Sequence, residues 1–183
     1  MNRLLWTLLG CALAFWSACS GPDQKQTPRP NIVYILADDM GYGDVSALNE
    51  QAAWQTPNID RLAEEGMVFT DAHSGSAVCT PTRYGILTGR YSWRSSLKSG
   101  VTWSWDDAII ESDRPTVGSF LQSQEYATAC IGKWHLGLGW QRHAGAPDSI
   151  DFGQPILRGP TTRGFDYFFG IAASLDIPPY VNI

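Results

Sequence analysis

The sequence lacks the features that mark several common classes of protein. Its 13 lysines and arginines are outnumbered by 18 aspartates and glutamates and form no basic stripe, which disfavours nucleic acid as a partner. The apolar run at residues 4–14 is too short to span a membrane comfortably. Beyond one short tether there are no repeats and no low-complexity stretches. These absences favour a globular protein whose chemistry depends on a local site.

The first residues are typical of an export signal. Arg3 precedes the apolar run, and Ala18 is followed by Cys19 in a segment that resembles a lipoprotein cleavage site. The resemblance implies cleavage before Cys19 and lipidation of its thiol, which would anchor the protein to a membrane. Trp16 stands where such sites usually carry an aliphatic residue, so ordinary secretion after Ala18 remains the alternative.

We therefore expect an exported protein, either a periplasmic or cell-envelope lipoprotein or a secreted one. The expected segments are a signal peptide at residues 1–18, a tether at residues 19–30 and the folded portion at residues 31–183.

Cysteine is scarce, with four residues in the chain. Cys11 would leave with the signal and Cys19 would be acylated, so Cys79 and Cys130 remain. An exported domain invites a disulfide, and Cys79 with Cys130 is the pairing that spares Cys19. The residues around Cys79 favour a different role for it.

Strand-like and helix-like segments alternate along the folded portion. Residues 31–37 are a continuous apolar run typical of a strand buried on both faces of a parallel sheet. Further strands are expected at 67–70, 126–131 and 164–170, and helices at 58–65 after Pro57, at 81–88 opened by Thr80, and at 116–124. This order predicts an α/β fold with a mainly parallel central sheet flanked by helices.

The carboxyl ends of parallel strands collect ligands, and polar residues follow the predicted strands there. Asp38 and Asp39 follow the first strand directly and provide hard oxygen ligands suited to Ca²⁺ or Mg²⁺. Taken alone, the pair could equally cap nearby backbone amides. Lys133 and His135 leave a later strand, so these groups and Cys79 are expected to converge.

Three short motifs carry a family resemblance. They are Cys79-Thr80-Pro81-Thr82-Arg83, Leu87-Thr88-Gly89-Arg90-Tyr91 and Gly132-Lys133-Trp134-His135-Leu136-Gly137. A lone cysteine is more often a small buried hydrophobe. Here the surrounding residues match the signature of the sulfatases, and the resemblance extends from about Asn31 to Tyr180.

The resemblance implies an alkaline-phosphatase-like sulfatase fold and a sulfuric ester hydrolase of the arylsulfatase type. It implies that a formylglycine-generating enzyme converts Cys79 to an aldehyde whose hydrate attacks sulfate esters. It implies metal ligation by Asp38, Asp39 and residue 79, usually with Ca²⁺ and less often with Mg²⁺. Arg83 would stabilise the hydrated aldehyde. The remaining implied roles are sulfate binding by Lys133, orientation or deprotonation of the nucleophile by His135, and substrate contact by Ser174.

We expect this domain to be incomplete. Full-length sulfatases carry, further along the chain, an Asp-Asn pair that completes the metal site plus another His and Lys, and no matching segment occurs here. The expectation is that these 183 residues alone are inactive or unstable and that the parent protein cleaves sulfate esters of a small molecule or carbohydrate.

Two other functions stay open. The first is a phosphate or phosphonate ester hydrolase of the same superfamily. The second is a non-catalytic, secreted carbohydrate-binding remnant that uses tryptophans as sugar-stacking walls, although aromatic residues more often belong to a core. The candidate tryptophans are Trp93, Trp103, Trp105, Trp134 and Trp140.

Overall fold

A computed structural model describes residues 28–178, 180, 182 and 183. The chain divides into two units, Met1–Asp39 and Met40–Ile183, and each is described by itself. The predicted signal peptide, Cys19 and most of the tether lie outside the described residues. Among the residues described, no helix has both the length and the apolar character needed to cross a membrane.

Two predicted strands are absent from the described part of the chain. Residues 31–37 in the first unit are irregular, and Val33 and Ile35 expose 82% and 80% of their surface. Residues 67–70 in the second unit are likewise irregular, with Phe69 72% exposed. A buried strand needs neighbours to take up its backbone hydrogen-bonding groups, and neither run is paired among the described residues. Both predictions are therefore wrong.

The three predicted helices are confirmed in the second unit. They are α2 (Pro57–Glu65), α3 (Cys79–Thr88) and α4 (Val117–Ser123), and the short 3₁₀ turns are η1 (Tyr42–Asp44), η2 (Ser92–Arg94) and η3 (Pro160–Thr162). Pro57 occupies the first turn of α2, where its missing N–H costs nothing. The Thr116 hydroxyl accepts from the Ser119 amide and caps α4.

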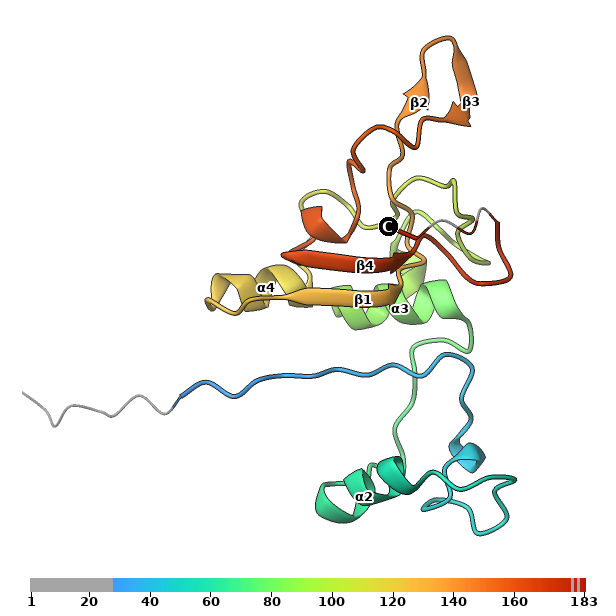
Figure 1. The fold of residues 1–183 in the computed structure, drawn as a ribbon, viewed down its shortest axis with the longest axis vertical. Helices are drawn as coiled ribbons and strands as arrows, with labels where there is room; N and C mark the ends of the chain where they lie inside the picture. The colour runs from blue at the N-terminus through green and yellow to red at the C-terminus, as the bar shows by residue number, and fades with distance from the viewer. Residues whose placement is uncertain (1–27, 179, 181) are drawn as a thin grey trace, which may run out of the picture. The chain divides into compact units, whose positions relative to one another are not determined.

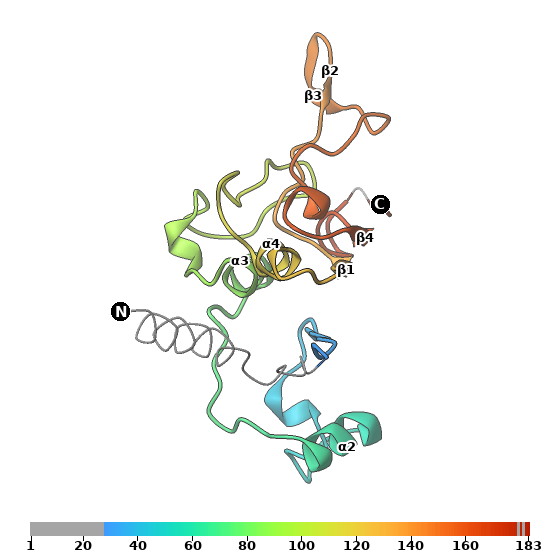
Figure 2. The same ribbon diagram turned by 90° about the vertical axis from the view of Figure 1, so that its left-hand side faces the viewer.

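Two small sheets complete the second unit. Strands β1 (Ala129–Lys133) and β4 (Tyr167–Ile171) pair in parallel, while β2 (Arg142–His143) and β3 (Ala146–Ile150) form an antiparallel hairpin. Helices α3 and α4 lie side by side next to β1 (Figures 1 and 2). The helices and this small parallel sheet make an incomplete α/β fold, so the predicted mainly parallel central sheet is present only in part.

The core joins α3 to the segments that follow the two parallel strands. Its buried members are Tyr84, Ile109, Ile110, Trp134, Leu136, Leu138 and Ala172. Tyr84 comes from α3, and its buried hydroxyl donates to the Glu111 carboxylate at 3.1 Å, so its polar atom is satisfied. Because Trp134 and Ala172 directly follow residues at the ends of β1 and β4, the core fixes α3 against the carboxyl ends of both strands.

Candidate active site

The carboxyl ends of the two parallel strands bring Lys133 and Ser174 together. The ladder continues past β1, because the Trp134 amide donates to the Ile171 carbonyl at 3.0 Å and the His135 amide donates to the Ala172 carbonyl at 3.0 Å. Lys133 Nζ donates to Ser174 Oγ at 3.0 Å. The strand ends therefore place Lys133 next to Ser174, whose part in a site was implied only by the family resemblance.

Asp176, which was not predicted from the sequence, is a carboxylate next to Lys133 and Ser174. The pKa of Asp176 lies below its usual value, first because Ser174 donates a side-chain hydrogen bond to it, then because its own amide does so. The positive charge of Lys133 and the nearby His135 ring add to this effect. Its signal in the sequence was the Ser-x-Asp pattern before two prolines, which on its own reads as an ordinary turn.

Cys79 is the first residue of α3 and is half-buried. The residue before it, Val78, makes no side-chain cap, so the helix start has no hydrogen bond from a capping side chain to its first-turn amides. Amides at a helix N-terminus and the helix dipole favour an anion. Gly89 ends the helix in the left-handed conformation with φ 65° and donates its amide to the Gly85 carbonyl.

Arg83 connects the cysteine helix to the lysine strand. It lies four residues after Cys79 and therefore on the same face of α3. Its guanidinium Nη1 donates to the Lys133 carbonyl at 2.7 Å. This contact holds the start of α3 next to the end of β1. The stabilisation of a nucleophile at position 79 by Arg83 stays a prediction.

His135 adopts a conformation that the sequence did not indicate. In an extended chain the side chains of Lys133 and His135 would point to the same side. His135 instead has a left-handed φ of 57° and is fully buried, so the strand alternation stops before it. Its Nε2 lies 2.7 Å from the Thr102 carbonyl. A carbonyl only accepts, so Nε2 carries the hydrogen. The ring is thereby fixed within the protein.

Two buried threonines support the His135 backbone. Thr80 Oγ1 donates to the His135 carbonyl at 2.9 Å and Thr102 Oγ1 donates to the same oxygen at 3.0 Å. The prediction that Thr80 opens the helix is therefore wrong, since α3 begins at Cys79 and the hydroxyl is used in this tertiary contact. The site is built on a polar network that joins α3, the loop at Thr102 and the segment after β1.

Asp38 and Asp39 end the first unit, and Asp39 has a left-handed φ of 60°. Their carboxylates are the hard oxygen donors that Ca²⁺ prefers, so their chemistry fits the implied ion. Two carboxylates supply only part of the 6–8 oxygens that Ca²⁺ usually takes. Within the described residues there is no group of three or more His, Cys, Asp and Glu arranged to hold a metal. The assignment of these two residues as metal ligands stays a prediction.

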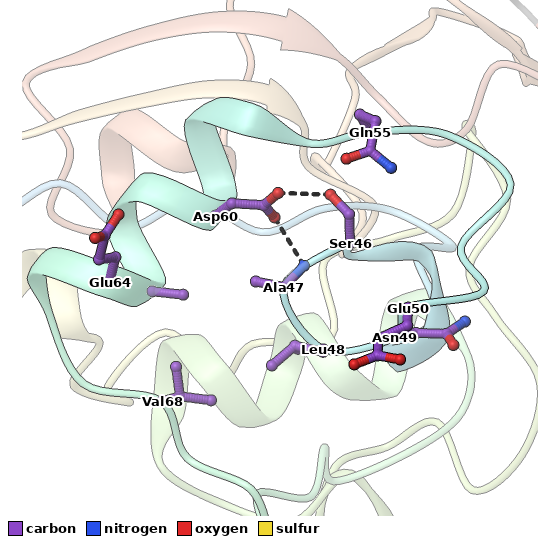
Figure 3. Close-up of a pocket in the computed structure, with 10 residues that line it drawn as sticks. Ser46, Ala47, Leu48, Asn49, Glu50, Gln55, Asp60, Glu64 and Val68 are labelled. Carbon is purple, nitrogen blue, oxygen red and sulfur yellow. Dashed lines mark hydrogen bonds between the residues drawn. The ribbon is translucent and has the colours of Figure 1, made fainter.

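A cavity next to α2 is not lined by any predicted site residue. It has a volume of about 670 Å³ between α2 and the preceding loop (Figure 3). Asp60 on its wall accepts from the Ser46 hydroxyl at 2.6 Å and the Ala47 amide at 3.0 Å. These bonds, with one from Thr56, lower the pKa of Asp60. Asp60 therefore ties the loop to α2, which is a structural role.

A smaller cavity of about 170 Å³ adjoins the start of α3. Val78 and Thr80, the residues on both sides of Cys79, line it, together with the serine-rich segment 92–99. Cys79, Lys133 and Ser174 themselves are not among the residues that line it.

Cys79 and Cys130 are both free thiols, so the disulfide between them is not formed. Cys130 lies half-buried in β1, and burial raises the pKa of its thiol, an effect that the charge of Arg83 partly opposes. A buried thiol with a raised pKa is a weak nucleophile. The two cysteines therefore differ in character, and Cys79 is the one at a helix N-terminus.

Gly137 should be indispensable for the segment that carries His135. It has φ 72°, and a Cβ placed on it would lie 2.1 Å from the Asp107 carbonyl oxygen. We expect Gly137→Ala to lower the free energy of unfolding by about 2–4 kcal/mol through backbone strain and steric overlap. Gly100→Ala is the matched control, because Gly100 has φ 76° with open space around it. Urea denaturation should show a clearly smaller loss for Gly100→Ala; equal losses would contradict the steric argument.

Comparison with known proteins identifies the family to which the chain belongs. The sulfatase family model matches residues 30–182. The chain is 40% identical to an N-acetylgalactosamine-6-O-sulfatase of Bacteroides thetaiotaomicron. That match covers 100% of this chain and 35% of the relative. It is also 40% identical to arylsulfatase G of Rattus norvegicus, covering 84% of this chain and 26% of that protein.

Solved structures agree. A sulfatase structure from work on glycosaminoglycan metabolism by Bacteroides thetaiotaomicron is 42% identical with a TM-score of 0.75, covering 86% of this chain and 31% of that one. Ps i-CgsB in complex with a neocarrahexaose is 28% identical with a TM-score of 0.60, covering 75% and 27%. The chain spans about a third of the length of the relatives it matches. On this evidence, the chain belongs to the sulfatase family.

Proposed function

We propose that the protein of which this chain forms part is a sulfuric ester hydrolase that uses position 79 as its nucleophile. The observation that carries the proposal is the Lys133–Ser174 hydrogen bond at the strand ends, coupled through Arg83 to the helix that Cys79 begins. An anion-favouring helix start, an ammonium group and a hydroxyl suit a sulfate group. Because the chain spans about a third of its relatives, the activity is assigned to the whole protein.

Lys133 and Ser174 are the proposed sulfate-binding pair. The Lys133 ammonium would bind the sulfate oxygens and stabilise the negative charge that grows as the ester bond breaks. Ser174 lies in the segment after β4 and accepts from Nζ at 3.0 Å, so it would hold the ammonium in place beside the substrate. Asp176 accepts from Ser174 and so helps to orient both groups.

Arg83 and His135 are the proposed supports of the nucleophile. Arg83 lies one turn after Cys79 and supplies positive charge on the same helix face. His135 would orient the nucleophile or take up its proton. Its fixed ring costs little reorganisation during reaction.

Two groups would complete this chemistry. Formylglycine, made from Cys79 by a formylglycine-generating enzyme, supplies an aldehyde hydrate with one hydroxyl for attack and a second for release of sulfate. Asp38 and Asp39 would hold a Ca²⁺ ion in part, and the chemistry that such an ion supplies is stabilisation of negative charge.

We further propose a sulfated carbohydrate as the substrate. One relative is named for N-acetylgalactosamine 6-O-sulfate and one related structure holds a carrageenan oligosaccharide. Export as a periplasmic, cell-envelope or secreted protein, with lipidation at Cys19 as the anchored form, suits an enzyme that meets polymers outside the cytoplasm. Globomycin sensitivity of precursor processing would test the lipoprotein form.

The decisive assay compares two esters of one alcohol. The whole protein, produced with a formylglycine-generating enzyme, is assayed on 4-nitrophenyl sulfate and 4-nitrophenyl phosphate. We expect a higher kcat/KM for the sulfate ester, because the family to which the chain belongs is that of the sulfatases. A preference for the phosphate ester would instead indicate a phosphohydrolase. Intact mass separates the third possibility, since an unmodified thiol at residue 79 after such production favours a non-catalytic carbohydrate-binding protein.

A further inference from the structure

Trp103 and Trp105 form an exposed aromatic pair in the loop between η2 and α4. Their ring centroids are 5.5 Å apart and their planes differ by 6°, so the indoles are stacked in parallel. Trp103 is 50% and Trp105 41% exposed, in contrast to Trp134, which is buried in the core. Exposed tryptophans of this kind commonly mark a binding surface.

The loop holds this pair firmly because inward and outward residues alternate. Thr102 and Ser104 are buried at 1% and 2% exposure, while the tryptophans on either side of Ser104 face outward. The Trp103 amide donates to the Asp106 carboxylate at 2.7 Å, which closes the turn. Both rings are therefore presented on an anchored backbone, which reduces the entropy lost on binding.

The buried residues next to the two tryptophans are hydrogen-bonded to segments of the candidate active site. Thr102 contacts His135 through its hydroxyl and its carbonyl, at 3.0 and 2.7 Å. Ser104 Oγ donates at 3.2 Å to the carbonyl of Ile177, in the loop that carries Ser174 and Asp176. The aromatic pair is thus a direct extension of both sides of the site.

The surroundings of the pair suit an anionic sugar. An indole face packs against the C–H face of a pyranose ring, while its edges leave room for the polar groups of the sugar. The Arg142 guanidinium donates to the Trp105 carbonyl at 3.0 Å, and the Asp106 carboxylate accepts from the Trp103 amide at 2.7 Å, so a cationic and an anionic side chain both contact the backbone of the pair. A purely apolar partner would gain nothing from these polar groups, whereas a sugar that carries hydroxyl and sulfate groups would.

We propose that Trp103 and Trp105 form a stacking subsite for a second sugar ring of a sulfated oligosaccharide, next to the ring whose sulfate enters the site. This inference rests on the proposed sulfatase function and adds the size of the substrate to it. The second exposed pair, Tyr91 with Trp93, has ring centroids 4.1 Å apart and lies at η2, where the Trp93 carbonyl accepts from Lys98 Nζ at 3.0 Å, so it offers the same chemistry at a different place in the chain. Trp93 therefore provides a matched control.

The binding test uses the whole protein carrying Cys79→Ala, which prevents turnover. Calorimetry measures the affinity for sulfated tetrasaccharides prepared from chondroitin sulfate and from carrageenan, and for the corresponding sulfated monosaccharides. We expect Trp103→Ala and Trp105→Ala each to weaken tetrasaccharide binding about tenfold, which corresponds to about 1.4 kcal/mol, and to leave monosaccharide binding unchanged. Trp93→Ala should change neither.

A kinetic arm separates this inference from the proposed function. In protein that keeps Cys79, the Trp103→Ala and Trp105→Ala variants should hydrolyse 4-nitrophenyl sulfate with the same kcat/KM as the parent protein. If the parent protein cleaves that ester and the variants keep full tetrasaccharide affinity, the subsite is refuted while the sulfatase function stands. Absence of tetrasaccharide binding by the parent, or an equal loss in the Trp93 variant, also refutes it. Failure of the parent to cleave any sulfate ester refutes the function, and the calorimetry still reports on the subsite.

Discussion

Cys79→Ala is expected to reduce sulfate ester hydrolysis by the whole protein by at least about four orders of magnitude, since removal of a covalent nucleophile leaves only residual catalysis by the binding groups. Cys79 begins α3, where the substitution changes no described hydrogen bond, and Ala is a good helix former. Thermal unfolding should therefore change little. The measurement is kcat/KM on 4-nitrophenyl sulfate.

Cys130→Ala provides the control for this experiment. The two cysteines share a chemical group, but the Cys130 thiol is half-buried in β1 with a raised pKa. We expect Cys130→Ala to keep activity within about threefold and to lose about 1 kcal/mol of stability from the missing packing. If activity depends on Cys130 and survives without Cys79, the assignment of the nucleophile is wrong.

Lys133→Met is expected to lower kcat by about 10²–10³-fold, because it removes the positive charge from the position proposed to face the sulfate and keeps most of the apolar stem. The Arg83 contact uses the Lys133 carbonyl, so the backbone link between α3 and β1 survives the substitution. A rise in KM with unchanged kcat would show that Lys133 binds the ground state only.

Ser174→Ala tests whether the lysine and the serine act as a pair. Their side chains are 3.0 Å apart, so the effects of Lys133→Met and Ser174→Ala should be clearly non-additive in the double variant. Strictly additive losses in kcat/KM would mean that the hydrogen bond between them has no part in catalysis.

The helices could be predicted because their signals are local. Pro57 marks the start of α2 and Gly89 the end of α3, and each acts through its own backbone geometry. The strands at 31–37 and 67–70 failed for the opposite reason. An apolar, β-branched run becomes a strand only when a distant segment pairs with it, and periodicity carries no information about that partner.

The candidate site was predictable in part for the same physical reason. The position of Lys133 at the end of a parallel strand follows from topology, whereas Ser174 was expected only from the family resemblance, and the observed hydrogen bond joins the two. The left-handed turn at His135 was not predictable, because residues other than glycine seldom adopt φ above zero and the cause here is a tertiary network. Thr80 and Thr102 are 22 positions apart, and no local pattern indicates that both bind one carbonyl.

The parallel pairing of β1 with β4 also has a kinetic consequence. Thr128, just before β1, binds Asp166 38 positions later, and the Arg83–Lys133 contact closes a loop of 50 positions. Non-local contacts of this kind give a high contact order. The entropy cost of closing these long loops must be met before the non-local contacts can form. The helices can therefore form early in folding, whereas the group around Lys133 assembles late, when the chain has already collapsed. During refolding, the helical circular dichroism signal should therefore recover faster than ligand binding does.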